Sequence, residues 1–325
     1  MRLSEAQREE IEASVPASAL VRKALEQYLD LTGMTPTEFA DACDRSPNTI
    51  RYFLRDEYSI IAGSDLLVRQ RVWEFMQSHP VAPETRDTGK VYKTKDYSLL
   101  RKCFFMALDR SRAYVVQADP GVGKTYLSKH LICELNRREL ANDNNGRRAY
   151  FVRSSGTMTA TQLLKEIAMA AGVASQGDSR RVLRALRRAF SGRAVLLVID
   201  EAQQLNIAAL EAVRELLDEP PHCGLLILGS HELERKFTAN AIELEQWNSR
   251  IFGFRALDGL SEDEARLILT EELPALPANV MRSILADCLV PHLRKRGTKY
   301  ISARRLFTTV EDIKANDGAE NGEVA

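Results

Sequence analysis

The spacing of hydrophobic residues divides this 325-residue chain into three parts. From Leu20 to Met76 apolar residues recur at helical spacing, which predicts short helices and gives no strand signal. Between residues 97 and 258, aliphatic runs such as AYVVQA and GLLILGS alternate with amphipathic stretches such as LSKHLICELNRREL. Uninterrupted apolar strands that alternate with helices are typical of an α/β fold whose parallel sheet is covered on both faces. After residue 259 helical spacing returns, and it opens on a capping box from Ser261 to Glu264.

Composition sets the boundaries between these parts. The stretch SHPVAPETRDTGK combines two prolines with a glycine and polar residues, which indicates a linker. The acidic, glycine-containing end NDGAENGEVA indicates a frayed tail. The predicted units are an N-terminal helical domain at residues 1–77, a linker at 78–96, an α/β core at 97–258, a helical lid at 259–315 and a tail at 316–325.

Residues 118–125 read ADPGVGKT and match the phosphate-binding pattern GxxxxGK[ST] at every fixed position except the first, where alanine replaces glycine. Gly121 and Gly123 supply a flexible backbone whose amides can point at phosphate oxygens at the start of a helix. We expect Lys124 to reach the terminal phosphates of ATP and the Thr125 hydroxyl to ligate Mg²⁺. An ordinary glycine turn between a strand and a helix is the alternative. The candidate nucleotide-binding residues of this loop are Pro120, Gly121, Val122, Gly123, Lys124, Thr125 and Tyr126.

A second motif, AVLLVIDEAQQL, ends an apolar run with two carboxylates. We expect Asp200 to hold Mg²⁺ directly or through water, and Glu201 to orient and deprotonate the attacking water. Two acids after an apolar run can also begin a helix, where negative charge is favourable. With the phosphate loop upstream, the pair predicts an ATPase that hydrolyses ATP to ADP and phosphate, rather than a passive nucleotide-binding protein.

Residues 97–310 resemble the AAA+ ATPases, because both motifs appear in the order of that family. The strand GLLILGS ends at Ser230, which the resemblance makes the residue that senses the γ-phosphate (sensor 1). The stretch WNSRIFGFRAL resembles the segment with the arginine finger, so Arg250 is the first candidate and Arg255 the second. A finger supplied by a neighbouring subunit implies a homo-oligomer, a ring or a helical filament, when ATP is bound. A solvated or salt-bridged side chain is the alternative for each arginine.

The stretch ISARRLF in the lid resembles the sensor 2 motif of the same family. The resemblance implies that Arg304 contacts the nucleotide, with Arg305 as the second candidate. The fold implied by these motifs is a P-loop AAA+ parallel-sheet core with a small helical lid, preceded by an all-α domain.

Residues 36–58, PTEFADACDRSPNTIRYFLRDEY, have the layout of a helix-turn-helix. The residues expected on the inner faces of its helices are Phe39, Ala40, Cys43, Ile50, Phe53 and Leu54. Asp44 occupies the turn, where glycine is usual, and aspartate tolerates a left-handed backbone better than most residues. The candidate DNA contacts on or near the exposed side of the second helix are Ser46, Asn48, Thr49, Arg51 and Arg55. Because acidic residues make this region no more than neutral, a helical protein-docking domain is the alternative.

Lysine plus arginine equal aspartate plus glutamate at 45 each, so any surface for nucleic acid must be local. Two clusters, SRRVLRALRRAFSGR and LRKRGTKY, are rich in cations. Repeated in a ring or filament, they can sum to a track for double-stranded DNA, and a solvated helix face is the alternative. The cationic residues of these clusters are Arg180, Arg181, Arg184, Arg187, Arg188, Arg193, Arg294, Lys295, Arg296 and Lys299.

The five cysteines form no CxxC pair, which favours reduced thiols over a disulfide framework or a zinc site. No apolar run is long enough to span a bilayer, and the polar N-terminal stretch is unlike a signal peptide. We therefore expect a cytoplasmic protein with no membrane partner.

The order of helix-turn-helix domain, linker, AAA+ core and short lid is similar to the transposition regulators of the phage Mu B, TniB and TnsC type. RSSGTMTATQLLKEIAMAAG and LGSHELERKF resemble segments of that group after the second strand and at sensor 1. The resemblance implies an ATPase that coats target DNA largely without regard to sequence, recruits a transposase for DNA transposition and recombination, and leaves on hydrolysis. Two alternatives stay open: an ATP-gated regulator of transcription or replication that reads a specific site, and a secretion-associated ATPase of the ExeA kind.

Overall fold

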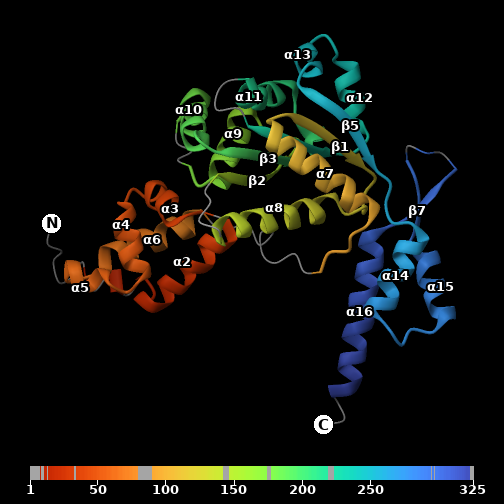
Figure 1. Cartoon of the computed structure of the whole chain (residues 1–325), viewed down its shortest axis with the longest axis horizontal. Helices are drawn as coiled ribbons and strands as arrows, with labels where there is room; N and C mark the ends of the chain where they lie inside the picture. Colours follow the sequence, from red (N-terminus) through yellow and green to blue (C-terminus); the bar gives the residue numbers. More distant parts are fainter. Residues whose placement is uncertain are drawn as a thin grey trace.

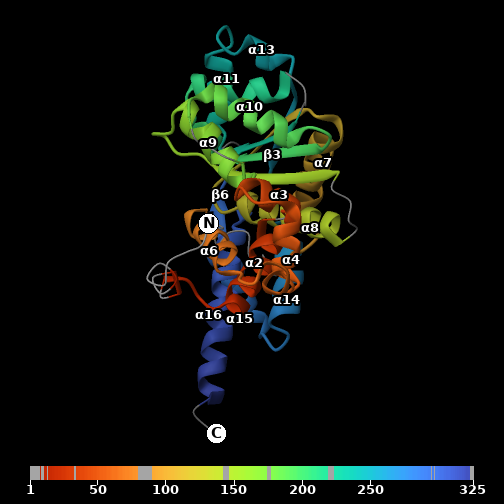
Figure 2. The same cartoon turned by 90° about the vertical axis from the view of Figure 1, so that its left-hand side faces the viewer.

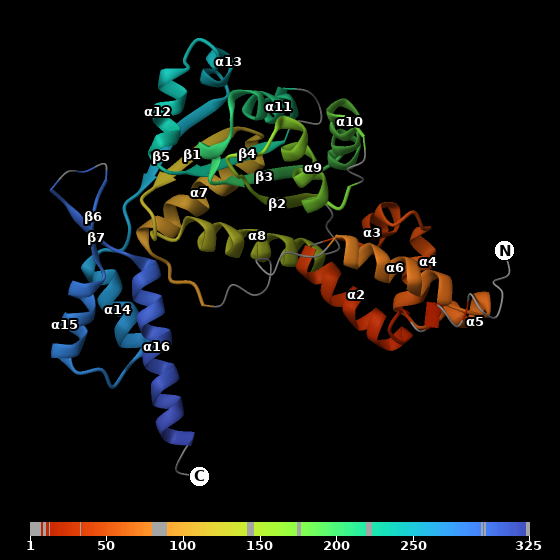
Figure 3. The same ribbon diagram turned by 180° about the vertical axis from the view of Figure 1, so that it is seen from behind.

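The structure, a computed structural model, has three units in chain order: N-terminal helices, an α/β core and a lid (Figure 1). The N-terminal helices lie at one end of the core and the lid lies at the other (Figures 1 and 3). The described residues are 8, 11–12, 14–32, 34–79, 90–141, 146–173, 177–218, 223–293, 295 and 297–322.

The N-terminal helices pack around one apolar cluster, and the described part of this unit contains no strand, as predicted. Its helices are α2 (Ser18–Thr32), α3 (Pro36–Ala42), α4 (Pro47–Leu54), α5 (Tyr58–Ala62) and α6 (Leu66–Ser78). The side chains predicted to face inward between α3 and α4 are buried, except Leu54, which is partly buried. Asp44 adopts a φ of 57°, so the prediction of a left-handed aspartate in the turn is confirmed. Whether this helix pair reads DNA stays a prediction.

A five-stranded parallel sheet forms the core, as predicted. Its strands lie in the order β2-β3-β4-β1-β5. Their bounds are β1 (Ala113–Ala118), β2 (Arg147–Arg153), β3 (Ala194–Asp200), β4 (Gly224–Gly229) and β5 (Ile251–Leu257). Because every strand pair is parallel, all five carboxyl ends meet at one edge of the sheet, where open α/β sheets bind their ligands.

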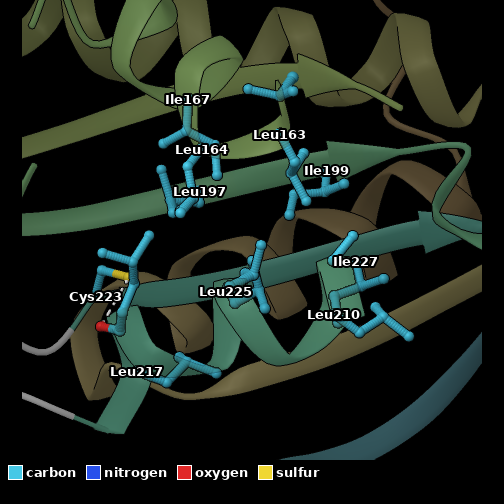
Figure 4. Close-up of a cluster of buried hydrophobic side chains, with 14 of the residues drawn as sticks. Leu163, Leu164, Ile167, Leu197, Ile199, Leu210, Leu217, Cys223, Leu225 and Ile227 are labelled. Carbon is cyan, nitrogen blue, oxygen red and sulfur yellow. Dashed lines mark hydrogen bonds between the residues drawn. The ribbon is translucent and has the colours of Figure 1, made fainter. Parts of the chain in front are cut away.

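Helices cover both faces of the sheet (Figures 1 and 3). One face carries α7 (Lys95–Arg110) and α8 (Lys124–Ala141), and the other carries α9 (Ala160–Ala170), α10 (Ser179–Phe190) and α11 (Ile207–Asp218). Figure 4 shows Ile167 of α9 and Leu210 of α11 packed with Leu197 and Leu225 of the strands. Short helices lie in the connections. The helix η2 (Ala202–Gln204) follows β3, α12 (Glu232–Ala239) follows β4, and α13 (Glu245–Asn248) precedes β5.

The lid contains two features that its helical spacing did not predict. Besides α14 (Glu262–Glu272) and α15 (Ala278–Asp287), it contains an antiparallel hairpin of β6 (Leu289–Pro291) and β7 (Lys299–Ile301). Its last helix, α16 (Ala303–Gly322), continues past residue 315, where we expected a frayed tail. The capping box at the start of α14 is present as predicted.

The first helix of the helix-turn-helix docks on the core. Glu38 of α3 forms an ion pair with Arg193, which precedes β3. Nearby, a side chain at Gly172 would collide with Met34, so glycine permits the close approach of the two units. Figure 2 shows α3 just below the strands of the core, with α10 above those strands on the same side of the molecule. Arg193 of the predicted basic cluster is therefore engaged within the chain.

Candidate nucleotide-binding site

The phosphate-binding loop connects the carboxyl end of β1 to the start of α8. Gly121 and Gly123 have φ values of 83° and 106°, which residues other than glycine rarely adopt. The two glycines therefore allow the loop a backbone conformation that few other residues could adopt, which is the role that the sequence motif gives them. Val122 of the loop is buried in the apolar core, whereas Tyr126 is exposed on α8 and donates a hydrogen bond to the Lys90 carbonyl at 2.9 Å.

Lys124 is the cation of this loop. Its ammonium group donates to the carbonyl oxygens of Ala118 at 3.0 Å and Asp119 at 3.5 Å. Burial lowers the pKa of Lys124, although the carboxylates of Asp200 and Glu201 oppose this effect. A partly buried ammonium group that donates to two carbonyl oxygens is well suited to bind phosphate oxygens.

Thr125 and Asp200 come from different elements and meet at the edge of the sheet. The Thr125 hydroxyl donates to Asp200 Oδ2 at 2.5 Å, and the Asp200 side chain is completely buried at the end of β3. A hydroxyl and a carboxylate are oxygen ligands of the kind that Mg²⁺ prefers, so this pair fits the ion. The described residues contain no cluster of three or more His, Cys, Asp or Glu that could hold a metal. Two protein ligands are sufficient, because Mg²⁺ in such sites takes further ligands from substrate phosphates and water.

Glu201 and Ser230 follow β3 and β4, which are neighbours in the sheet. Glu201 has a φ of 57°, an uncommon conformation for a residue other than glycine. Gln203 lies between the two predicted residues: it donates to Glu201 Oε2 at 2.6 Å and accepts from the Ser230 backbone N–H at 3.1 Å. The sequence motif did not identify Gln203 as a site residue.

The lid reaches the phosphate loop through its hairpin and the start of α16. The Arg304 backbone N–H donates to the Gly121 carbonyl at 3.0 Å, and the Tyr300 hydroxyl donates to the Pro120 carbonyl at 2.7 Å. The positive charge of Arg304 also contributes to the lowered pKa of Lys124. Arg305 instead donates to the Asp287 carbonyl inside the lid at 3.0 Å. Of the two sensor 2 candidates, the structure therefore brings Arg304 to the loop.

Asp119 joins the loop to two other elements and was also missed by the motif. Its carboxylate is 2% exposed and accepts from the Leu293 backbone N–H at 3.1 Å. His292 of the lid lies 3.1 Å from one carboxylate oxygen, and His231, directly after Ser230, lies 3.3 Å from the other. These contacts tie the phosphate loop to the lid hairpin and to the end of β4.

Arg250 lies apart from the other predicted site residues. It precedes β5, whose first residue pairs with Ala113 at the start of β1. The phosphate loop follows the other end of β1, roughly 16 Å further along the strand. Arg250 forms an ion pair with Asp218 of α11, and Arg255, the second candidate, is exposed on β5. Arg250 cannot reach the phosphate loop of its own chain, so a finger role stays a prediction about contacts between subunits.

The predicted DNA contacts fall on three separate surfaces. Arg51 and Arg55 are exposed on α4, and Lys295 and Lys299 are exposed on the lid hairpin. The exposed arginines of α10 are Arg180, Arg181, Arg184 and Arg188. The helix α10 and the hairpin lie at opposite ends of the core, so one subunit does not join them (Figures 1 and 3).

Some of these cations are already paired within the chain. Arg187 of α10 contacts Glu215 of α11 at 3.8 Å, and Lys295 pairs with Asp258 at 2.7 Å. Arg294 and Arg296 lie outside the described residues.

In the part of the chain that the structure describes, none of the helices has the length and apolar character needed to cross a membrane.

The chain is similar to a known domain family and to two proteins of phage or prophage origin. A model of the AAA domain family matches residues 108–237. The chain is 26% identical over 252 residues to the ATP-dependent target DNA activator B of Escherichia phage Mu, which covers 76% of each protein. It is 23% identical over 221 residues to the Mu-like prophage FluMu DNA transposition protein B of Haemophilus influenzae, which covers 64% of this chain and 69% of that protein.

A solved structure of the Aeropyrum pernix ORC1 protein in complex with DNA matches with a TM-score of 0.50 and 15% identity. The match covers 69% of this chain and 60% of that one, and it shows the fold alone. The chain therefore carries an AAA domain and resembles the phage Mu B type of transposition protein over three quarters of its length.

Proposed function

We propose that the protein is an ATPase that assembles on double-stranded DNA when ATP is bound and marks that DNA for a transposase. The observation that carries the ATPase is the meeting of Lys124, the Thr125–Asp200 pair and Glu201 at one edge of the sheet. The similarity to the target DNA activator of phage Mu supports duplex DNA as the partner and transposition as the process.

The proposed chemistry assigns each residue a role. Loop amides and Lys124 bind the β- and γ-phosphates, while Thr125 and Asp200 hold Mg²⁺, which neutralises phosphate charge when bound. Glu201 accepts a proton as the oxygen of water attacks the γ-phosphorus. The bond from that phosphorus to the bridging oxygen breaks, and ADP leaves with the electron pair.

Three residues are proposed to contact the γ-phosphate. Ser230 and Arg304 act from the same chain, because β4 and the start of the lid helix both lie beside the loop. Arg250 acts from a neighbouring subunit, which makes hydrolysis depend on a homo-oligomer, a ring or a filament.

The DNA-binding part of the proposal rests on α10. Arg180, Arg184 and Arg188 are spaced by four residues and exposed, so they lie along one face of the helix. In an oligomer each subunit repeats this face, and contacts to phosphates bind DNA without regard to sequence. ATP then stabilises the assembled state, and its cleavage removes the differential binding that maintained it.

A second candidate function is a regulator that reads one DNA site. It is favoured by α4, whose first turn is capped by the Ser46 side chain and whose Arg51 and Arg55 are exposed. Footprinting separates the two candidates, because a site reader protects one sequence and a target selector protects unrelated DNA uniformly.

Electron microscopy of the purified protein with random-sequence duplex DNA tests the proposal directly. With a slowly hydrolysed ATP analogue and Mg²⁺ we expect the protein to coat the DNA, and without nucleotide we expect only scattered particles. Particles that stay small and indifferent to DNA in both conditions would contradict the proposed assembly and direct the search to a protein partner.

Charge reversal on α10 tests the DNA surface. The double variant Arg184→Glu, Arg188→Glu is expected to lose at least about tenfold in affinity for random duplex DNA at low salt, because two phosphate contacts become repulsive. The slope of log affinity against log salt concentration is expected to fall by about two. Arg282→Glu, on the exposed side of the lid helix α15, is the matched control. An unchanged salt slope in the double variant would remove α10 from the DNA interface.

A further inference from the structure

The Gln203 side chain links the ends of two neighbouring strands. Its amide NH₂ donates to Glu201 Oε2 at 2.6 Å, and its amide oxygen accepts from the Ser230 N–H at 3.1 Å. Glu201 is the predicted general base after β3, and Ser230 is the predicted γ-phosphate contact after β4. Gln203 thus makes a direct bridge between the two predicted residues.

The surroundings of Gln203 leave room for this bridge. A Cβ atom at Gly229 would lie 2.7 Å from the Gln203 amide oxygen, which is closer than real contacts allow. Glycine at this position therefore permits the amide to approach the end of β4. The Gln203 backbone is also anchored, because its carbonyl accepts a hydrogen bond from the Lys236 ammonium group of α12. The same ammonium group donates to the Leu205 carbonyl at 2.6 Å.

Glu201 depends on such a bridge for a fixed orientation. The Glu201 backbone is held at a φ of 57°, and its N–H donates to Asp200 Oδ1 at 2.9 Å, so the main chain is fixed. A glutamate side chain still has three rotatable bonds, and a general base must stay within hydrogen-bond reach of the water that it activates. The contact with Gln203 removes this freedom by holding one carboxylate oxygen and leaving the other available.

We propose that Gln203 is a positioning residue for ATP hydrolysis. Its side chain holds the Glu201 carboxylate in a fixed position relative to Ser230. The inference rests on the proposed ATPase and deepens it, because one side chain then aligns the base with the γ-phosphate contact. Gln203 acts through Glu201 and the end of β4 rather than on ATP itself, so it affects the chemical step and leaves ATP binding to the phosphate loop.

Gln203→Met tests this role, because methionine has a similar length and makes neither hydrogen bond. We expect kcat for ATP hydrolysis to fall roughly 10- to 100-fold, the loss typical of a misplaced catalytic group, with KM and ATP affinity nearly unchanged. After incubation with ATP and Mg²⁺, the nucleotide released by denaturing the variant is expected to be mainly ATP, where wild type releases mainly ADP. Gln204→Met is the matched control, since Gln204 is the exposed neighbour.

A second variant, Gly229→Ala, perturbs the same bridge from the other side. Its methyl group pushes against the Gln203 amide oxygen, so we expect a smaller loss of kcat in the same direction. Unchanged kcat in Gln203→Met, a rise in kcat, or a parallel loss of ATP affinity would each overturn the inference. A wild-type protein that binds ATP without hydrolysing it would instead refute the ATPase itself.

Discussion

Lys124→Ala is expected to abolish ATP binding and, with it, the ATP-dependent assembly on DNA. The Lys124 ammonium group is partly buried beside the loop, so its contact with phosphate is a partly desolvated ion pair. Truncating one partner of such a pair costs at least about 3 kcal/mol of binding free energy, which is roughly 100-fold or more in the dissociation constant. Equilibrium binding of a fluorescent ATP analogue measures this loss, and electron microscopy shows whether the DNA stays uncoated.

The control for this variant is Lys129→Ala on the same helix. Lys129 lies more than one helical turn along α8 from Lys124, and its ammonium group is 4.7 Å from the ring centre of Phe151 on β2, so its removal leaves the phosphate site intact. We expect ATP affinity within about twofold of wild type for this control, since its cation–π contact is with Phe151 and not with the phosphate loop. If Lys124→Ala binds ATP as tightly as Lys129→Ala, the nucleotide does not bind at the loop between β1 and α8.

Local sequence patterns were sufficient to predict the α/β core, because each pattern involves residues that are close together in the chain. Strands such as AVLLVID are buried on both faces and therefore read as continuous apolar runs. Asp200 and the loop glycines were identified from fixed spacings, and the structure brings Thr125 to Asp200 across 75 residues of sequence. The turn at Asp44 followed from the same local reasoning about backbone conformation.

Contacts between distant segments were beyond these patterns. Gln203 touches Ser230 only because β3 and β4 are adjacent in the sheet, and no spacing within IDEAQQL encodes that contact. The strands β6 and β7 have three residues each, too few to show alternation. The helix α16 continues through a polar, glycine-containing sequence because its first half packs in the lid, and a helix once started adds each further residue at low cost.

The charged residues show the same difference between what a local sequence pattern predicts and what only the fold determines. A net charge of zero could only show that a basic surface must be local, and the clusters in the sequence appeared similar. The structure separates them: Arg193 and Lys295 are engaged by Glu38 and Asp258, whereas Arg184 and Arg188 stay exposed on α10. Pairing, which depends on the fold, decides which cations are available to DNA.

Glu201→Gln is expected to stop hydrolysis while leaving ATP binding and DNA assembly intact. The glutamine has the same size and makes no new charge, but it cannot accept the proton of the attacking water. Loss of a general base costs roughly 10²- to 10⁴-fold in rate, so ATP turnover is expected to fall to background. Because assembly requires bound ATP rather than its cleavage, the variant is expected to stay on DNA long after wild type has dissociated. Phosphate release and the lifetime of the DNA complex measure the two effects separately.

The contrast with Lys124→Ala makes this prediction specific. One variant lacks the contact that binds ATP, and the other lacks the group that cleaves it, so they should fail at opposite stages of one cycle. Glu166→Gln, an exposed glutamate on α9, is the matched control and is expected to hydrolyse ATP and leave DNA as wild type does. Equal loss of assembly in Lys124→Ala and Glu201→Gln would contradict this division of roles. Glu201 would then be needed to form the ATP-bound assembly and not only to dismantle it.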